Sequence, residues 1–438
     1  MEEITISPLP LAHNNLLPSI IKVIGVGGGG GNAVNHMYRQ GITDVTFAVC
    51  NTDIQDLAKS PVPFKLQLGP QLTSGLGAGA NPETGRLAAE ESIEDIKNML
   101  SDNTKMVFIT AGMGGGTGTG ASPVIARAAK EMKILTIAIV TIPFIFEGAP
   151  KIRSALEGVR ALNKYVDAIL VINNEKLTTL YPKMNFSEAF RYADDVLLNA
   201  AKSIAEIITV PGHINLDFAD VKRILENGQV AVMNTGLADG ELRIANAIKN
   251  ALYSPLLDND ISTSKKILLN FYCSQNAELQ ISMEEVRQIN KFMEQMSQNI
   301  DVVWGISFDD SLEKTVKVTL IATGFNIDAI PGMRELIESD PEPEPEPPVI
   351  EVQRPQYTQQ QPQQIQRPQN PDHSENLKIN DYDLIKKIYG QPDVQPQKSS
   401  QNDEQDDMPT FSLKDILTEM QDESKAWYIE NVPPLKRK

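Results

Sequence analysis

The sequence predicts an α/β protein whose first part is a doubly wound parallel sheet. Apolar strand-like runs alternate with amphipathic helical segments over roughly the first 330 residues. Two glycine-rich stretches each lie between a buried strand and a helix, where sheets of this kind bind ligands. A long helical segment then separates this part from a smaller α/β block with a more mixed sheet.

The composition allows a sizeable core and argues against several classes of function. The chain has 438 residues, 41 % of them hydrophobic, and a formal net charge of −17. Such an acidic chain lacks the basic field that non-specific binding to nucleic acid or anionic membrane needs, so we expect no nucleic-acid partner. No apolar run is long enough to span a bilayer, and the N-terminus lacks a signal-peptide core. We therefore expect a cytoplasmic protein without direct membrane insertion.

The two cysteines and the four histidines give no metal signal. Cys50 and Cys273 lie far apart, each inside an apolar run, and the histidines are scattered. Buried thiols in a reducing compartment are the simplest interpretation, and we expect no metal site built from protein ligands alone.

The predicted elements of the first part alternate along the chain. The first strand, "SIIKVIGV", is uniformly apolar, and the helix after it is closed by Gly41. Pro82, followed by acidic residues, marks the start of a later helix. Strands are predicted at residues 19–26, 44–52, 105–112, 134–143 and 168–173, and helices at 32–41, 82–100, 122–132 and 154–166.

A long helix over residues 187–210 leads into the second part. Its apolar residues recur at intervals of three and four, and Asn185 with Glu188 fits a capping box at its start. Beyond it, strands are predicted at residues 265–274, 301–310 and 315–325, with a helix at 282–297.

The composition changes sharply near Ser339. The segment "PEPEPEPPVIEVQRPQ" begins a region rich in Pro and Gln, which predicts a disordered linker over residues 331–423. Two weak helical patches, at 381–390 and 411–420, have no assigned function. The last residues, Trp427–Lys438, combine aromatic, aliphatic and basic side chains, which indicates a partner-binding peptide over residues 424–438. Residues 1–19 are expected to be an N-terminal tail.

The two glycine stretches predict a phosphate-binding site. Gly27–Gly31 and Gly112–Gly120 ("GMGGGTGTG") each follow a strand, so their backbone N–H groups and the next helix N-terminus can bind an anion. Thr117 and Thr119 add hydroxyl groups. Neither stretch is a Walker A motif. "GVGGGG" also satisfies the weak GxGxxG pattern, and Asp53 lies where a ribose-binding acid would follow, so an NAD-dependent oxidoreductase stays open as an alternative.

Six motifs give the chain a specific resemblance. They are "IKVIGVGGGGGNAVNHM", "NTD", "GLGAGANPETG", "AGMGGGTGTGASPVIA", "FEG" and "INLDFADV". In order and spacing this set resembles the FtsZ branch of the tubulin/FtsZ superfamily of GTPases, over residues 21–325. The resemblance implies a GTP-binding domain at 20–184, a central helix at 185–210 and a second domain at 211–330. It also implies GTP or GDP as ligand, with Mg²⁺ held mainly by the nucleotide phosphates.

The resemblance implies nucleotide contacts from several loops and from the long helix. Glu147 resembles the family's ribose-binding acid. Lys151 stands where the family has an arginine, and Arg153 follows two residues later, so which of the two meets the nucleotide is open. For Asn51 and Asp53, turn capping is the alternative role. The complete set is Gly28, Gly29, Gly30, Gly31, Asn32, Asn51, Asp53, Gly79, Gly116, Thr117, Gly118, Glu147, Lys151, Phe190 and Asp194.

Two residues of the long helix are assigned to the base. Phe190 and Asp194 are four residues apart and share one helix face. Phe190 would stack on the base, with core packing as the alternative role. An ionised Asp194 offers only acceptors, which match the N1–H and N2–H₂ donors of guanine and not adenine.

The hydrolytic candidates are Asn215, Asp217 and Asp220 in "INLDFADV". In the resembling family this loop reaches the nucleotide of the next subunit in a head-to-tail filament, where its carboxylates position the attacking water. Capping of the following helix is the alternative role. His213 stands where many family members have an apolar residue.

The resemblance also implies a cellular role. Its filaments form the cytokinetic ring of bacterial cell division at mid-cell, and the terminal peptide Trp427–Lys438 would bind membrane-tethering and division proteins. A non-hydrolysing structural filament of the same fold is a further alternative.

Overall fold

The computed structural model describes residues 19–180, 183–252, 263–295 and 300–338. The predicted N-terminal tail before Ser19, both helical patches of the linker and the terminal peptide lie outside the described residues. The predicted linker, 331–423, is described only at its start, where helix α13 (Met333–Glu338) buries Met333 and Leu336. Packing therefore continues beyond residue 330 as far as Leu336.

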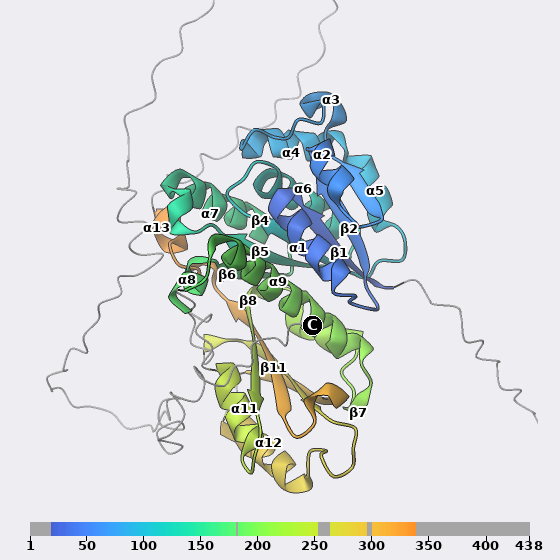
Figure 1. The fold of residues 1–438 in the computed structure, drawn as a ribbon, viewed down its shortest axis with the longest axis vertical. Coiled ribbons are helices and arrows are strands. Elements are labelled where there is room, and N and C mark those ends of the chain that lie inside the picture. Colours follow the sequence, from blue (N-terminus) through green and yellow to red (C-terminus); the bar gives the residue numbers. More distant parts are fainter. Residues whose placement is uncertain (1–18, 181–182, 253–262, 296–299, 339–438) are drawn as a thin grey trace, which may run out of the picture. The chain divides into compact units, whose positions relative to one another are not determined.

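One hydrogen-bonded sheet of eleven strands runs through the described residues (Figure 1). The strand order is β3-β2-β1-β4-β5-β6-β8-β11-β9-β10-β7. Its first six strands are all parallel, which confirms the predicted parallel sheet. They are β1 (Ile21–Val26), β2 (Thr46–Asn51), β3 (Phe64–Gln67), β4 (Met106–Gly112), β5 (Leu135–Ile142) and β6 (Ala168–Asn173).

The remaining strands form the mixed part of the sheet. β8 (Gln229–Ala238) continues the parallel order from β6, but only residues 168–170 pair with 229–231. β11 (Val316–Phe325) runs antiparallel to β8 and to β9 (Lys266–Cys273). β10 (Asp301–Phe308) is parallel to β9, and the short edge strand β7 (Gly212–Ile214) is antiparallel to β10. The predicted mixed sheet is confirmed, although β8 was not anticipated.

Two hydrophobic clusters lie on opposite faces of this sheet. Alternate residues of a strand enter different clusters, as Ile24 and Val26 do against Ile21 and Val23 in β1. Helices cover both faces, which is the doubly wound arrangement. On one face lie α4 (Pro82–Glu91), α5 (Ile93–Leu100), α6 (Thr117–Glu131), α7 (Ala149–Asn163), α11 (Arg243–Leu252), α12 (Met283–Gln295) and α13. The other face holds α1 (Gly27–Arg39), α9 (Phe186–Thr209) and α10 (Phe218–Leu225).

Both helices that follow the glycine stretches begin earlier than predicted. α1 starts at Gly27 instead of residue 32, and α6 at Thr117 instead of residue 122. Gly27–Gly31 thus form the first helical turn of α1, with Gly27 alone of its run at positive φ, whereas in the second stretch only Gly118 and Gly120 lie in the helix. A Cβ on Gly30 would overlap the carbonyl oxygen of Thr110. The absence of side chains therefore lets α1 pack directly on β4.

Other differences concern connections. The predicted helix 82–100 is divided at Ser92, whose hydroxyl accepts a hydrogen bond from Gly69 N at 3.0 Å. The short helices α2 (Ile54–Lys59), α3 (Pro70–Thr73) and α8 (Glu175–Leu180) were also not predicted. They are too short for a periodic apolar pattern to reveal them.

The long helix α9 begins with the predicted capping box. Asn185 Oδ1 accepts a hydrogen bond from Glu188 N at 2.9 Å, and Glu188 Oε2 accepts one from Asn185 N at 3.1 Å. The helix has 24 residues and packs against α1 and β5, and also against α10. No helix among the described residues is long and apolar enough to cross a membrane.

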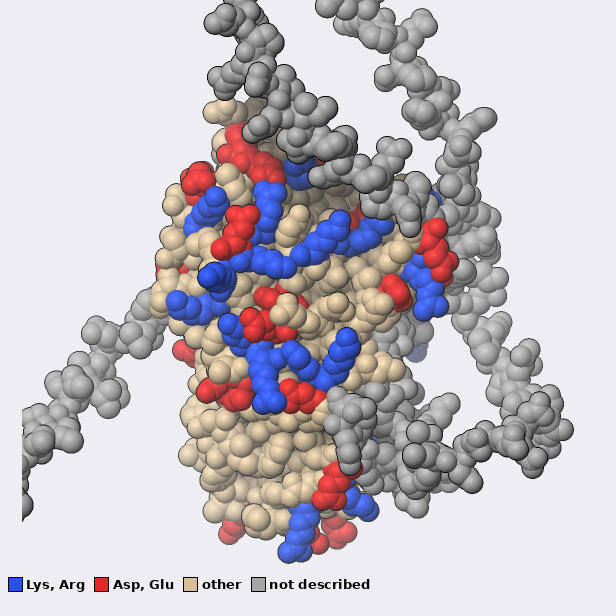
Figure 2. Space-filling view, turned by 180° about the vertical axis from the view of Figure 1, so that it is seen from behind, with Lys and Arg blue, Asp and Glu red and all other residues tan. Residues whose placement is uncertain are grey.

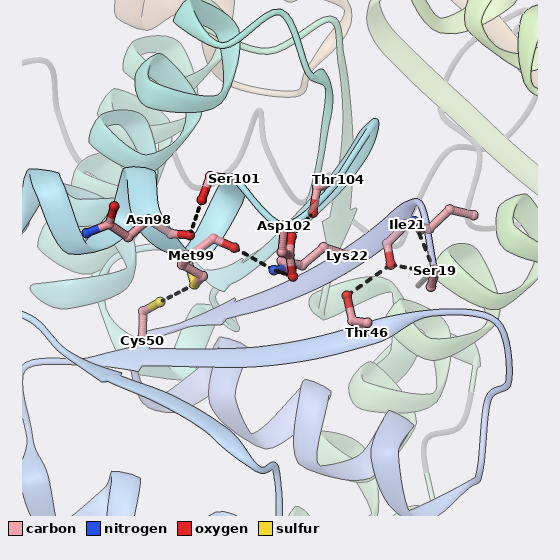
Figure 3. A network of polar contacts seen from close by, with 10 residues as sticks. All are labelled: Ser19, Ile21, Lys22, Thr46, Cys50, Asn98, Met99, Ser101, Asp102 and Thr104. Atoms are coloured by element: carbon pink, nitrogen blue, oxygen red, sulfur yellow. Dashed lines mark hydrogen bonds and ion pairs between the residues drawn. The ribbon is translucent and has the colours of Figure 1, made fainter. Parts of the chain in front are cut away.

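A buried lysine fixes the first strand to α5 (Figure 3). Lys22 Nζ donates to the carbonyl of Met99 at 2.5 Å and to Asp102 Oδ2 at 2.7 Å. The ammonium thus lies at the C-terminal end of α5, where a cation is favourable. Partial burial raises the pKa of Asp102, but hydrogen bonds from Lys22 and Thr104 outweigh it and leave that pKa below its ordinary value.

Both cysteines are buried and unpaired, as predicted. Cys50 Sγ lies 3.9 Å from Met99 Sδ in the same region (Figure 3), and burial raises the pKa of this thiol to about 12. It stays protonated at neutral pH and acts as a small apolar residue.

The surface carries both signs of charge. On the face seen in Figure 2, Lys and Arg side chains are interspersed with Asp and Glu over the upper part, and much of the lower part is uncharged. This face presents no extended field of one sign.

Candidate functional site

The fold brings the two glycine turns side by side. β1 and β4 are adjacent parallel strands, so the turns that follow them lie at the same edge of the sheet. A Cβ on Gly27 would lie 2.8 Å from Gly118 N, and one on Gly29 would lie 3.2 Å from Gly112 Cα. The two turns therefore form one backbone surface.

A third loop closes against this surface. A Cβ on Gly116 would lie 2.8 Å from the Ala78 Cβ and 2.9 Å from Asn81 N. Asn81 also caps α4, because its Oδ1 accepts a hydrogen bond from Glu83 N at 2.9 Å. The loop "GAGANPETG" thus borders the second glycine turn.

Other glycines of the site have open space where a Cβ would be. No atom lies within 4 Å of that position for Gly31, Gly79 or Gly115, and for Gly28 the nearest is Asp56 Oδ2 at 3.7 Å. Gly28 and Gly31 also border a hollow that is lined by Gly27, Asn32, Asn51 and Ser60 among others. Open backbone at the starts of two helices is chemically suited to phosphate oxygens.

The threonines near the turns hold the turns together. Thr117 Oγ1 lies 2.6 Å from Thr52 Oγ1, and both residues are buried. Thr119 Oγ1 accepts a hydrogen bond from Gly114 N at 2.8 Å. These hydroxyls shape the second turn from within.

Asn51 and Asp53 perform the capping that was the alternative to ligand binding. Asp53 Oδ1 accepts hydrogen bonds from Gln55 N at 2.8 Å and Asp56 N at 3.3 Å at the start of α2. Asn51 is buried, and its Oδ1 lies 3.3 Å from Asp53 N. Both residues lie at the end of β2, which borders the glycine turns.

Glu147 and Lys151 are paired with each other. Glu147 Oε1 accepts a hydrogen bond from Phe144 N at 2.9 Å, and Oε2 lies 2.5 Å from Lys151 Nζ. A Cβ on Gly114 would lie 2.6 Å from the Lys151 carbonyl oxygen, so the start of α7 rests on the second glycine turn. A role of Lys151 or Arg153 at a nucleotide stays a prediction.

The base candidates lie in an aromatic cluster at the end of β5. The Phe190 ring is 5.1 Å from the Phe144 ring in an edge-to-face arrangement, and Phe144 stacks on Phe146 at 5.0 Å. Phe144 is buried, whereas Phe190 is 37 % exposed and Phe146 is 59 % exposed. Phe190 therefore packs on one side and leaves part of its ring accessible.

The pKa of the Asp194 carboxyl group is well above its ordinary value. Burial raises its pKa to about 6, the nearby charge of Asp195 also raises it, and His36 lowers it. His36 Nε2 lies 2.6 Å from Asp195 Oδ1, which joins α1 to α9. A carboxylate that is partly desolvated in this way gains most from a ligand that supplies hydrogen-bond donors.

The acidic loop lies at the other end of α9. Phe190 and the helix end at Thr209 are separated by roughly 28 Å, at about 1.5 Å per residue. Figure 1 shows β7, which leads into the loop, at the lower end of α9, whereas α1 lies beside the upper part of α9. The structure does not bring Asn215, Asp217 and Asp220 to the glycine turns of the same chain.

The acids of this loop cap α10, as their alternative role predicted. Asp217 Oδ1 accepts hydrogen bonds from Ala219 N at 2.8 Å and Asp220 N at 3.0 Å, and Asp220 Oδ2 accepts one from Asp217 N at 3.1 Å. Asn215 Oδ1 accepts one from Gly212 N at 2.6 Å. Asp217 is exposed and Asp220 is half-buried, so the caps hold both carboxylates at the surface.

His213 now has a structural explanation. Its ring lies edge-to-face on Phe308 with the ring centres 4.8 Å apart, and its Nε2 is 3.1 Å from Gln280 Oε1. The imidazole thus links β7 to β10 and to a neighbouring loop.

In the part of the chain that the structure describes, no group of three His, Cys, Asp or Glu side chains is suited to hold a metal ion.

Sequence reasoning missed several residues of this region. Asn81 had a local signal, because it precedes a proline at a helix start. Thr52 and Phe144 had weaker local signals in the sequence. His36 and Asp195 had none, since they are 159 positions apart and only tertiary packing joins them.

Comparison with known proteins gives two family matches. The model described as Tubulin/FtsZ family, GTPase domain, matches residues 20–182. The model described as FtsZ family, C-terminal domain, matches residues 229–326. The first match contradicts the dinucleotide-binding alternative, because it assigns both glycine turns to a GTPase domain.

Several known proteins are similar to this chain. The cell division protein FtsZ of Porphyromonas gingivalis is 52 % identical over 314 residues, which cover 71 % of this chain and 68 % of that protein. FtsZ of Buchnera aphidicola is 46 % identical over 320 residues, which cover 72 % of this chain and 81 % of that protein. The structure of an empty FtsZ dimer from M. jannaschii aligns with a TM-score of 0.64 at 42 % identity, covering 69 % of this chain and 88 % of that one. CetZ2 from Haloferax volcanii, at 19 % identity and a TM-score of 0.60, shares the fold.

Proposed function

Because the chain belongs to the tubulin/FtsZ family of GTPases, as a cell-division protein of that family, we propose that it polymerises head to tail and hydrolyses GTP between subunits. The observation that carries this proposal is the separation of the glycine turns from the acidic loop. One chain holds both halves of a hydrolytic site, and α9 keeps them apart. A second copy would have to supply the missing half.

Nucleotide binding is assigned to the edge formed by the two glycine turns. Backbone N–H groups at the starts of α1 and α6 would hold the phosphates, with Gly28, Gly31, Gly79 and the second glycine turn providing close approach. Phe190 would lie against the base, and Asp194 would accept hydrogen bonds from the guanine edge. Mg²⁺, held mainly through phosphate oxygens, would neutralise charge that develops during phosphoryl transfer.

Hydrolysis is assigned to the acidic loop acting in trans. Asp217 and Asp220 are held at the surface by their capping bonds, and Asn215 is fixed to Gly212. Presented to the nucleotide of a neighbouring subunit, the carboxylates would orient the attacking water. Positioning of this kind is most of what phosphoryl transfer requires from a protein. Turnover would then depend on assembly.

The proposed assembly is an open filament. A contact between two different surfaces of the same chain repeats without closing unless its rotation forms a ring. The similar FtsZ of M. jannaschii was determined as a dimer, which supports self-association through this fold. We place the filament in the cytoplasm at the mid-cell ring, with the terminal peptide Trp427–Lys438 binding membrane-tethering and division proteins.

Phosphate release measured across a range of protein concentrations tests this proposal. We expect almost no release per molecule below a threshold concentration and a steep rise above it, because each site is completed by a second copy. Asp220→Ala should keep GTP affinity within about threefold and lose at least about 10²-fold in turnover, a typical loss when a reacting group is no longer positioned.

Three results would contradict this mechanism. Turnover that is independent of protein concentration would place the hydrolytic groups within one chain. Equal losses of GTP binding and turnover in Asp220→Ala would remove the acid from the hydrolytic step. Filaments without phosphate release at any concentration would favour the non-hydrolysing alternative.

A further inference from the structure

A histidine and an aspartate connect the two helices that would hold opposite ends of the nucleotide. His36 lies in the last part of α1, and Asp195 follows the proposed base-reading Asp194 on α9. Their atoms Nε2 and Oδ1 are 2.6 Å apart, and the side chains are only 18 % and 23 % exposed. A contact this short and this sheltered restrains the two helices relative to each other.

The contact joins the two helices that border the proposed nucleotide site. α1 begins with the open glycines that face the phosphates, and His36 lies roughly 13 Å farther along the same helix, at about 1.5 Å per residue. α9 carries Phe190 and Asp194. Bonding of His36 to Asp195 therefore adds a polar restraint to the apolar packing between the phosphate-holding and base-holding helices.

The charges around Asp194 are few. On α9 itself the neighbouring Asp195 opposes ionisation of Asp194, and on α1 His36 favours it. β5 packs against α9 with apolar side chains such as Ile137 and Ile139. The Asp194 carboxylate is thus balanced mainly between one acid and one imidazole.

The other elements packed on α9 hold charges that have their own contacts. On α8, Glu175 accepts hydrogen bonds from Ile145 N and Thr178 Oγ1, and Lys176 also makes contacts. On α10, near the far end of α9, Lys222 is paired with Glu226 at 3.6 Å. Neither helix shifts the ionisation of Asp194.

Guanine recognition requires the ionised form of Asp194. The N1–H and N2–H₂ groups of guanine are donors, and a carboxylate accepts from both of them. Protonation converts one oxygen into a donor and leaves the guanine edge with a mismatched partner. A positive charge that compensates the negative charge of Asp195 therefore favours the ionised form of Asp194, which can accept hydrogen bonds from guanine.

We propose that His36 and Asp195 form a positioning pair that determines how strongly the site prefers guanine. The pair aligns α9 on α1, and the imidazole, when protonated, compensates the Asp195 charge beside Asp194. This inference rests on the proposed function, in which Asp194 meets the base. It assigns His36 a role in base specificity without contact to the nucleotide.

Binding of GDP and IDP to the full-length protein between pH 5.5 and 8 tests the pair. IDP lacks the 2-amino group, and diphosphates avoid turnover. In His36→Gln the amide can still donate to Asp195 but carries no charge. We expect the GDP-over-IDP preference to fall at least about threefold, and the pH at which GDP affinity is lost to rise by about half a unit.

The double variant His36→Gln/Asp195→Asn separates electrostatics from packing. It removes the acid that His36 compensates, so preference and pH profile should return toward those of the parent, as coupled residues do in a double-mutant cycle. Asp194→Asn should have a flat profile. His213→Gln, a change in the other part of the sheet, should bind both nucleotides like the parent.

Three outcomes would overturn the inference. Equal weakening of GDP and IDP binding in His36→Gln would make the pair a general structural contact. An unchanged pH profile in that variant would do the same, and so would a double variant that is worse than either single one. A parent protein that does not prefer GDP over IDP would instead refute the assignment of Asp194, and the proposed base recognition with it.

Discussion

The two ends of α9 present functional residues in different ways. At the N-terminal end, some glycines of the turns, such as Gly27 and Gly30, lie too close to neighbouring backbone for a side chain, and Phe190 and Asp194 are partly enclosed. At the C-terminal end, Asp217 and Asp220 stand at the surface and bond to backbone N–H groups of their own helix. The proposed function of the N-terminal end depends on backbone shape, whereas that of the C-terminal end depends on a few side chains.

This difference separates binding from turnover. A substitution at a closely packed glycine of the turns changes the shape of the sheet edge, so it affects folding as well as nucleotide affinity. A substitution in the acidic loop can leave the fold intact, because the capping bonds are replaceable by other acceptors. The following variants sharpen or break this contrast, from the largest expected effect to the smallest.

The largest effect is expected from Gly30→Ala, with Gly31→Ala as its matched control. A methyl group on Gly30 would overlap the Thr110 carbonyl, so we expect a loss of about 1–3 kcal/mol or more in the free energy of unfolding, together with loss of GTP binding. Gly31 has no atom within 4 Å of its Cβ position. Alanine there should stabilise α1 by about 0.5–1 kcal/mol and still weaken GTP binding.

Urea unfolding without nucleotide, followed by GTP titration, distinguishes the two variants. The contrast fails if Gly31→Ala binds GTP like the parent, since the open space above α1 would then hold no phosphate. It also fails if Gly30→Ala is as stable as the parent.

An intermediate effect is expected from Asp217→Asn. Asparagine caps a helix as well as aspartate does, so the hydrogen bonds to Ala219 N and Asp220 N should survive. The stability should change by less than about 0.5 kcal/mol, whereas GTP turnover should fall at least about 10²-fold with the loss of the charge. Thermal unfolding and phosphate release above the assembly threshold measure both quantities. Full turnover in this variant would reduce Asp217 to a structural cap.

The smallest effect is expected from Asp194→Asn on stability. The pKa of this carboxyl is raised to about 6 in the folded protein from the ordinary value of 3.8, mainly by burial. The native state therefore binds a proton more tightly than the unfolded state, and stability is lost as the pH rises from about 4 to 6.

Because Asp194→Asn removes this titratable group, the variant should not lose stability as the pH rises from about 4 to 6. At pH 7 the variant should be more stable than the parent by on the order of 1 kcal/mol, with a smaller difference at pH 4. Chemical unfolding at both pH values measures this. A variant that is destabilised at pH 7 and little changed at pH 4 would show that Asp194 is held by contacts that favour its charged form.

Local patterns were sufficient for the larger elements. The apolar runs at β1, β4 and β5 predict strands because parallel strands are buried on both faces. The capping box of Asn185 and Glu188 predicts the start of α9. The start of α1 was misplaced, because a run of glycines is typical of a loop and only packing on β4 makes it a helical turn. β8 was missed although it joins the two parts of the sheet.

By itself the sequence determined the alternation of strands and helices, the order of the motifs and therefore the family, because these are encoded in neighbouring residues. Only the tertiary structure decided which glycines are required by packing and which face open space. It also decided that His36 meets Asp195 and that the acidic loop lies at the far end of α9 from the glycine turns. Such relations join residues distant in the sequence, and their distances follow from how helices pack on a sheet.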